Sequence, residues 1–201
     1  MVFFFRAAIV LTLSPITQAA QWTSEAVKFR EEDFTILPPF CRAKIAQQNN
    51  REIQEYYIRR YGQNWGNMHH YCFGLKALNL AYRDFNNKAK REYFLKQAVN
   101  EFDYVLEHAD QDFSLRPEVL IQRGRALTQS RNYDEAKESI EEALKTDPKS
   151  VDAWVALSDL YSMTGKNLEA IKVLEKAIEI TGNEHKKITA RLDDLRKRAT
   201  R

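Results

Sequence analysis

Apolar residues return every three or four positions through two neighbouring blocks of the chain, residues 117–150 and residues 151–184. That period is typical of helices with one buried face. A short polar break interrupts each block near its middle, at Arg131 and Asn132 in the first and at Gly165 to Asn167 in the second. Turn-forming residues between two periodic segments end one helix and begin the next. Each block is therefore predicted to be a helix, a tight turn and a second helix.

The two blocks also repeat each other. When they are aligned end to end, Gly124 faces Ser158 and Ala136 faces Ala170. Two antiparallel helices joined by a short turn pass close together, and their closest contact admits only small residues. We expect Gly124 to lie opposite Ala136, and Ser158 to lie opposite Ala170. One such pair cannot bury its apolar face alone, so neighbouring pairs are expected to stack.

These positions resemble the signature of the tetratricopeptide repeat. The matching residues are Gly124, Leu127, Ala136, Ile140, Ala143 and Pro148 in the first block, and Trp154, Leu157, Ser158, Tyr161, Ala170, Leu174 and Ala177 in the second. Arg123 departs from the family preference for Leu, and Gly182 departs from its preference for Pro. The resemblance implies an all-α fold, a short right-handed solenoid of stacked antiparallel helix pairs.

The segments beside the two blocks extend the predicted stack. Residues 65–116 are interpreted as an altered helix pair, with Gly74 at the close contact and the turn at residues 86–88. Residues 21–64 are expected to form an extended lead-in, which packs Phe34, Ile36 and Phe40 against the stack, and then a helix over residues 42–60. Residues 185–201 are predicted to be a capping helix, because Ile188, Leu192 and Leu195 share one face.

The first twenty residues differ in kind from the rest. Residues 1–13 are apolar except for Arg6 and Thr12, and small residues follow at 17–20. A short positive start, an apolar stretch and then small residues are typical of a secretory signal, here with cleavage after Ala19. The alternative is an uncleaved membrane anchor, but Arg6 and Pro15 leave far fewer than the roughly 20 apolar residues that a spanning helix needs. We assign residues 1–20 to this signal segment and expect it to be cleaved off, leaving the mature protein in a bacterial periplasm with no stable membrane insertion.

Charge and composition narrow the range of functions. The chain carries 31 basic and 28 acidic residues, and its net charge of +3 predicts no nucleic-acid surface. No nucleophile–base set, paired carboxylates or glycine-rich phosphate loop stands out, so no catalytic site and no cofactor are expected. The aromatic residues Tyr56, Tyr57 and Trp65 could hold a glycan, although aromatic residues at helical spacing are usually part of a core.

Cys41 and Cys72 are the only cysteines in the chain. An even number of cysteines in an exported protein favours a disulfide, and the alternative is two separate buried thiols. His69 and Cys72 stand three residues apart on a predicted helix and could share a metal ion, together with Cys41. No second paired motif accompanies them, so no metal is expected, and His69 and His70 are interpreted as hydrogen-bonding residues at a helix start. A small redox or metal-handling protein that uses Cys41, His69 and Cys72 stays open as the rival function.

The resemblance also implies where a partner would bind. First helices of tetratricopeptide repeats line the inner, concave surface, so the residues implied at this surface are Tyr71, Leu75, Leu78, Asn79, Ile121, Arg125, Thr128, Val155, Asp159 and Ser162. Family members that hold the carboxylate end of heat-shock chaperones use Lys and Asn in a clamp at these positions, and here only Arg125 is basic. A mixed apolar surface suits a helix or an extended peptide instead. We expect a non-catalytic scaffold for a protein partner in a cell-envelope assembly, and association of two copies stays open.

Overall fold

The computed structural model describes residues 15–182 and 185–199, and these residues form helices and connecting turns without any strand. Two short 3-10 helices, η1 (Glu31–Thr35) and η2 (Gly62–Asn67), interrupt the α-helices in the N-terminal part of the chain. The α-helices are α1 (Pro15–Val27), α2 (Pro39–Ile45), α3 (Arg51–Tyr61), α4 (Met68–Arg83), α5 (Lys88–His108), α6 (Arg116–Gln129), α7 (Tyr133–Thr146), α8 (Val151–Met163), α9 (Asn167–Thr181) and α10 (Lys186–Ala199).

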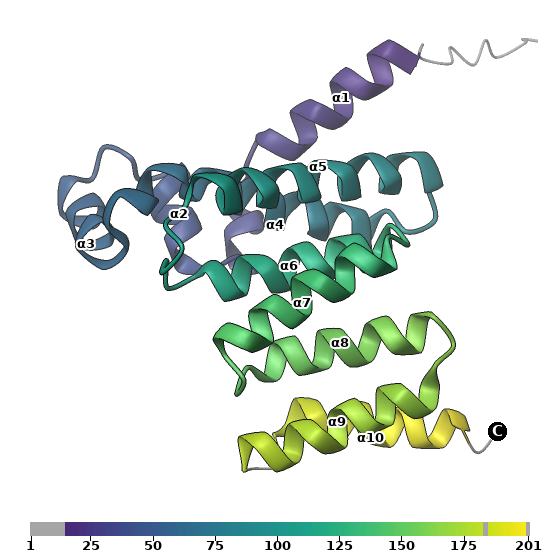
Figure 1. The fold of residues 1–201 in the computed structure, drawn as a ribbon. Coiled ribbons are helices and arrows are strands. Elements are labelled where there is room, and N and C mark those ends of the chain that lie inside the picture. Colours follow the sequence, from purple (N-terminus) through teal and green to yellow (C-terminus); the bar gives the residue numbers. More distant parts are fainter. Residues whose placement is uncertain (1–14, 183–184, 200–201) are drawn as a thin grey trace, which may run out of the picture.

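Three antiparallel helix pairs follow one another along the molecule (Figure 1). The pairs are α4 with α5, α6 with α7 and α8 with α9, and each pair packs on the next through α5 with α6 and α7 with α8. The helix α10 closes the stack by packing on α9 and α8. The predicted all-α stack of helix pairs is therefore confirmed, and the helices α6 to α9 occupy the two repeating blocks of the sequence.

Small residues bring the paired helices together, as predicted. A Cβ atom on Gly124 would lie 2.5 Å from Ile140 Cγ1 and 3.2 Å from the Ala136 carbonyl oxygen, so only glycine fits there. In the next pair the Ser158 hydroxyl donates a hydrogen bond of 3.0 Å to the Ala170 carbonyl oxygen. The two pairs thus use the same position for close approach, by different contacts.

The altered pair α4 and α5 is longer than the two regular pairs. Its turn falls at residues 84–87, close to the predicted one, and a Cβ atom on Gly74 would lie 2.6 Å from the Phe102 ring. The small residue on α4 is therefore matched to a large aromatic side chain on α5. This contact differs from the aliphatic contact that Gly124 makes.

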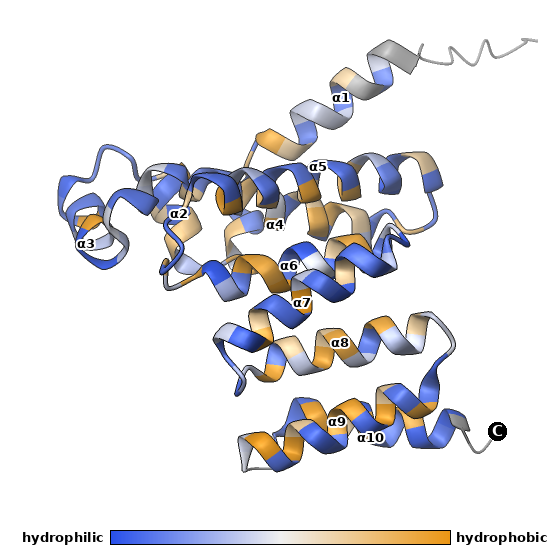
Figure 2. Ribbon diagram, in the orientation of Figure 1, coloured by the Kyte–Doolittle hydropathy of each residue, from blue (hydrophilic) through white to orange (hydrophobic). Residues whose placement is uncertain are grey.

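The buried residues form two clusters, one for each half of the molecule. The N-terminal cluster draws on α1 to α5 and on one side of α6, and it is rich in aromatic side chains, with Tyr71, Phe94 and Phe102 fully buried. The C-terminal cluster is mostly aliphatic and includes Ile140, Leu174 and the predicted capping residues Ile188, Leu192 and Leu195. Figure 2 shows apolar and polar positions alternating along α6 to α10, as expected for helices buried on one side.

The N-terminal segment differs from the sequence prediction in two ways. The single helix expected over residues 42–60 is two helices, α2 and α3, because the polar stretch at residues 46–50 interrupts the helix and Asn50 caps α3 through its side chain. The lead-in expected to be extended contains η1 and the end of α1. Ile36 is exposed instead of packed, whereas Leu37 beside it is buried.

The predicted signal segment is described only in part. Residues 1–14 lie outside the described residues, and residues 15–20 begin α1, which continues to Val27. Within the described part of the chain, no helix combines the length and the apolar character that crossing a membrane requires.

Candidate partner-binding groove

A hollow of about 470 Å³ lies along the first helices of the three pairs, where α4, α6 and α8 face residues 36–38 of the N-terminal segment. Its lining residues combine apolar side chains, amides and charges. They are Ile36, Leu37, Pro38, Tyr71, Leu75, Leu78, Asn79, Tyr82, Glu118, Gln122, Arg125, Thr128, Gln129, Ala156 and Asp159. We call this hollow the groove.

The structure brings together most of the side chains that were predicted to form a partner surface. Those that line the groove are Tyr71, Leu75, Leu78, Asn79, Arg125, Thr128 and Asp159. Ile121 does not reach it, because its side chain is buried in the C-terminal core. Val155 packs against that same core, and Ser162 lies near the turn, where its hydroxyl is 3.5 Å from Asn167 Oδ1. These three residues do not line the groove.

Sequence reasoning missed the polar edge of α6. Glu118, Gln122, Arg125 and Gln129 all line the groove, at the spacing of one helix face. The prediction had placed Ile121, Arg125 and Thr128 on that face. The groove keeps Arg125 and Thr128 of that face, but Ile121 is drawn into the core, and Gln122 and Gln129 line the groove instead. The spacing of Glu118 and Gln122, four residues apart and followed by Arg125, could have indicated this polar face from the sequence.

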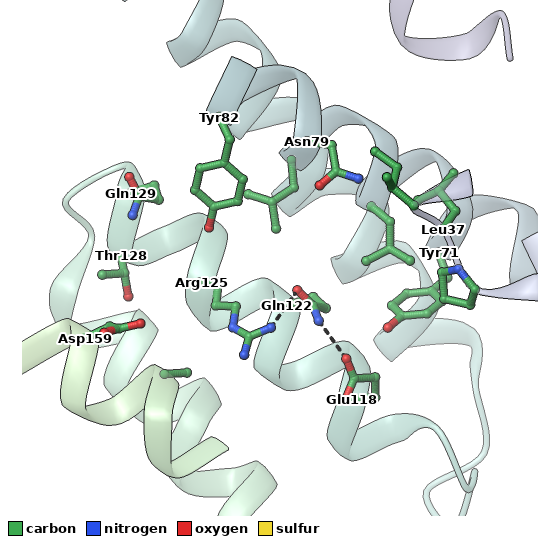
Figure 3. Close-up of a pocket in the computed structure, with 15 residues that line it drawn as sticks. Leu37, Tyr71, Asn79, Tyr82, Glu118, Gln122, Arg125, Thr128, Gln129 and Asp159 are labelled. Atoms are coloured by element: carbon green, nitrogen blue, oxygen red, sulfur yellow. Dashed lines mark hydrogen bonds between the residues drawn. The ribbon is translucent and has the colours of Figure 1, made fainter. Parts of the chain in front are cut away.

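A chain of hydrogen bonds runs along this edge (Figure 3). The Gln122 amide donates to Glu118 Oε1 at 2.6 Å, and Arg125 Nη1 donates to Gln122 Oε1 at 3.4 Å. Arg125 also lies 3.2 Å from Asp152 Oδ1 of α8. Arg125 Nη2 also donates to the Asp152 carbonyl oxygen at 3.4 Å, and the side chain remains partly exposed in the groove. A partner carboxylate or carbonyl group could therefore reach it.

Two polar groups in the groove make no hydrogen bond to any other described residue. These are the Asn79 amide, which is half-buried on α4, and the Tyr82 hydroxyl near the end of the same helix. Figure 3 shows the Tyr82 hydroxyl pointing into the space that Arg125 also faces. Open hydrogen-bonding capacity of this kind suits the backbone of an extended polypeptide.

Tyr71 forms part of the groove floor but is almost fully buried. Burial, followed by the nearby negative charge of Glu118, raises the pKa of Tyr71 well above its usual range. The hydroxyl is therefore neutral at physiological pH. The Tyr71 ring also stacks on Phe40, with centroids 5.9 Å apart, so this side chain supports the N-terminal segment as well as the groove.

Two carboxylates of α8 near the groove have opposite electrostatic environments. Burial raises the pKa of Asp159, and the neighbouring Arg191 and Arg125 only partly offset that effect. Burial also acts to raise the pKa of Asp152, but hydrogen bonding to Lys187 and the positive charge of Arg125 outweigh it, and the pKa is lowered. The ionised carboxylate is thus better stabilised at Asp152 than at Asp159.

Cys41 and Cys72 form a disulfide that joins α2 to α4, and both residues are fully buried. The predicted bond is present, and neither sulfur is a free thiol. His69 Nδ1 lies 3.0 Å from the Gly66 carbonyl oxygen, and His70 Nδ1 lies 2.6 Å from Glu101 Oε2, in keeping with hydrogen-bonding histidines at a helix start. The part of the chain that the structure describes holds no cluster of three or more His, Cys, Asp or Glu suited to a metal ion.

The comparisons with known proteins agree with this architecture. Residues 127–192 match the tetratricopeptide repeat family. The peroxisomal targeting signal receptor of Candida glabrata is 26% identical over 134 residues, which are 64% of this chain but 23% of that protein. The chain therefore spans about a quarter of that relative.

Two solved structures also align with much of the chain. A thermophilic tetratricopeptide-repeat protein of Thermus thermophilus shares 18% identity over 77% of each chain, with a TM-score of 0.54. The tetratricopeptide-repeat domain of Sgt2 from Aspergillus fumigatus shares 23% identity over 62% of this chain and 80% of that domain, with a TM-score of 0.45. The first of these likenesses shows the fold, and the family match supports the tetratricopeptide-repeat assignment.

Proposed function

We propose that this chain, a tetratricopeptide-repeat protein by its family match and its fold, is a non-catalytic scaffold that holds a segment of a protein partner in the groove. Stacked helical repeats expose long hollow surfaces that suit polypeptide partners. The observation that carries the proposal is the groove itself, with its apolar floor and unused hydrogen-bonding groups.

The chemistry of the groove favours an extended segment. Leu75 and Leu78 offer an apolar floor, while Asn79 and Tyr82 offer hydrogen bonds that nothing in the described chain uses. An extended chain presents backbone N–H and C=O groups along its length and side chains to alternate sides. It can therefore satisfy the polar groups and fill the apolar surface at once.

The charges in the groove do not form a basic clamp. Arg125 pairs with Asp152 and shares the groove with Glu118 and Asp159, so the surface is mixed in sign. A partner segment with both an acidic and a basic group would complement it better than a strongly acidic tail. The relative in Candida glabrata is named as a receptor for a targeting signal, which is compatible with recognition of a short peptide segment here.

We further place this activity in the bacterial cell envelope, on the strength of the apolar start of the chain and the disulfide. Disulfides persist in oxidising compartments and are rare in the cytosol. In this proposal the chain is exported, processed after Ala19, and serves a periplasmic assembly. N-terminal sequencing of the protein purified from the periplasmic fraction tests this part: a chain that begins at Ala20 supports it, and an intact start in the cytosolic fraction refutes it.

A photoreactive side chain placed in the groove tests the binding proposal directly. Tyr82 is the better position, because it is 44% exposed and lines the groove, so its replacement leaves the core intact. Phe85 is the matched control, since it is an aromatic residue in the following turn, 67% exposed and absent from the groove lining.

Irradiation in living cells should give a defined covalent adduct from position 82 and none from position 85. Replacing Asn79 by Ala together with Arg125 by Gln should reduce that adduct, whereas Asn86→Ala with Arg59→Gln, both on exposed surfaces outside the groove, should not. Equal adducts from both labelled positions, or an adduct that survives the groove substitutions, would refute the assignment.

A further inference from the structure

The N-terminal segment contributes a wall that no tetratricopeptide-repeat helix supplies. Leu37 is buried and lines the groove on one side and a larger hollow of about 910 Å³ on the other. Residues 36–38 therefore separate two hollows and set one edge of the groove. Side chains of α4, α6 and α8 form the rest of its lining.

This wall is fastened to the stack at several points. The disulfide joins Cys41, three residues beyond the wall, to Cys72 of α4. On the other side of the wall, Asp33 Oδ2 lies 2.9 Å from the ammonium of Lys76, which also donates a hydrogen bond to the Lys28 carbonyl oxygen. The segment is thus held to α4 on both sides of residues 36–38.

Ile36 is the side chain of the wall that remains available to a partner. It is 68% exposed and lines both the groove and an adjoining hollow of about 260 Å³. Leu37 and Asn79 also line both hollows, so the two hollows are neighbours beside the Ile36 side chain. An exposed isoleucine is ordinary by itself, but here it stands beside the unused Asn79 amide and above the apolar residues Leu75 and Leu78.

We propose that residues 36–38, held by the Cys41–Cys72 disulfide, are the specificity-determining wall of the groove, and that Ile36 selects an apolar side chain in an extended partner segment. This inference rests on the proposed function of the groove. The partner residue packs between Ile36 and the leucines of α4, while its backbone meets Asn79. Residues of α6 and α8 contact the remainder of the segment.

A displayed library of random peptides, selected on the oxidised protein, supplies a probe for this inference. Peptides that bind in the groove are recognised by their loss of binding to the Asn79→Ala/Arg125→Gln variant. Ile36→Asn should weaken such peptides about tenfold, the effect of removing part of an apolar contact. Selection on the Ile36→Asn protein should also lose the apolar preference at one peptide position.

Ile58→Asn is the matched control. Ile58 is an isoleucine of similar exposure, 51%, on α3, and it lines none of the hollows described above. The Ile58→Asn substitution should leave both the peptide affinity and the peptide preference unchanged. Groove-dependent peptides with the same affinity and preference on Ile36→Asn would overturn the inference while leaving the proposed function standing. Failure to recover any groove-dependent peptide would overturn the proposed function, and the inference with it.

The positioning role of the disulfide needs a separate readout. Replacing both cysteines by Ser should weaken the selected peptide while the helical signal of the repeats is kept. In that background Ile36→Asn should have a smaller effect than in the oxidised protein, because the wall then keeps only its attachment through Lys76, and such coupling is the signature of residues that act together. A full effect of Ile36→Asn without the disulfide would show that the bond does not position the wall.

Discussion

The two halves of this molecule reach the same architecture by different means. From α6 to α10 the helices repeat one design, in which a small residue on the first helix meets the second helix and aliphatic side chains fill the space between pairs. From α1 to α5 the contacts are not repeated: a disulfide, a buried lysine and a group of stacked aromatic rings join segments of irregular length.

This difference indicates which contacts stabilise each half and which contacts hold the groove in shape. A repeat half depends on nearest-neighbour packing, so its stability is spread over many similar contacts. The irregular half depends on a few single contacts, and those contacts hold the wall that completes the groove. We therefore expect single substitutions in the irregular half to lower the free energy of unfolding more than single substitutions in the regular half.

The largest effect should follow from Lys76→Met. The Lys76 side chain is 4% exposed and its partner Asp33 is 13% exposed, so the substitution leaves a buried carboxylate without its cation. Breaking such a pair by removing one partner costs about 3–5 kcal/mol of unfolding free energy. Denaturant unfolding should show this loss, and Lys76→Met with Asp33→Asn should recover most of it. An unchanged midpoint for the single variant would contradict this view of the N-terminal half.

Replacing Cys41 and Cys72 by Ser should have the next largest effect. The bond closes a loop with a sequence separation of 31, for which chain-entropy arguments give about 3–4 kcal/mol. The loss should be confined to the N-terminal half, so hydrogen exchange should accelerate in α2 and α4 but not in α8 and α9. Uniform acceleration over the whole chain would show that the two halves unfold as one unit.

The close contacts of both halves should be intolerant of a single methyl group. Helix propensity favours Ala over Gly by about 1 kcal/mol, yet we expect Gly124→Ala and Gly74→Ala to destabilise by about 1–3 kcal/mol through overpacking. Gly66→Ala is the control, because nothing lies within 4 Å of a Cβ atom there, and it should change stability little.

Phe102→Leu tests how the N-terminal contact is built. A smaller side chain opposite Gly74 should restore part of the stability of Gly74→Ala and none of that of Gly124→Ala, whose neighbour is Ile140. Thermal unfolding of the single and double variants measures this directly. Equal rescue of both glycine variants would mean that the two contacts are not independent.

The smallest effect concerns the ion pairs that hold the capping helix. Asp152 lies 2.9 Å from Lys187, and its pKa is lowered in spite of burial, so its contribution is present above the unfolded pKa of about 3.9 and is lost as pH falls through the lower folded pKa. Asp152→Asn should lower stability at neutral pH by under about 1 kcal/mol, since the pair is partly exposed.

Asp159 should behave in the opposite sense. Burial raises its folded pKa above the unfolded value, so the folded protein binds this proton more tightly and gains stability from the site as pH falls through the raised pKa toward the unfolded pKa. Asp159→Asn should therefore not lower stability at neutral pH, despite the ion pair with Arg191. Melting temperatures of both variants across acid pH decide this, and a loss of the same sign in both would contradict the assignment.

The regular half was largely predictable from the sequence, because its apolar residues and its small close-contact residues recur at fixed spacing. The alignment of Gly124 with Ser158, and the spacing of Ile188, Leu192 and Leu195, predicted the helix pairs and the cap. The orientation of α6 was less accessible, since Ile121 lies in the core and its neighbour Gln122 lines the groove instead. Periodicity defines a helix more tightly than it defines which edge of that helix faces a neighbour.

The irregular half was only partly predictable. The disulfide was favoured by the number of cysteines and the expected compartment, but the path of residues 28–41 depends on contacts between residues far apart in sequence, such as Lys76 with Asp33. No local pattern signals a buried lysine of this kind. The wall at residues 36–38 was therefore not predicted, although Pro38 and Pro39 indicated that residues 37–40 could not lie in the interior of a helix.

The central claim is that one groove is walled by both halves of the molecule. Titration of isotope-labelled protein with a groove-selected peptide, followed by amide chemical shifts, tests it most directly. We predict that the amide chemical shifts change in two groups of residues. One group is the N-terminal wall together with Asn79, and the other is the α6 edge from Glu118 to Gln129. Shifts confined to one half, or centred outside the groove, would contradict the account.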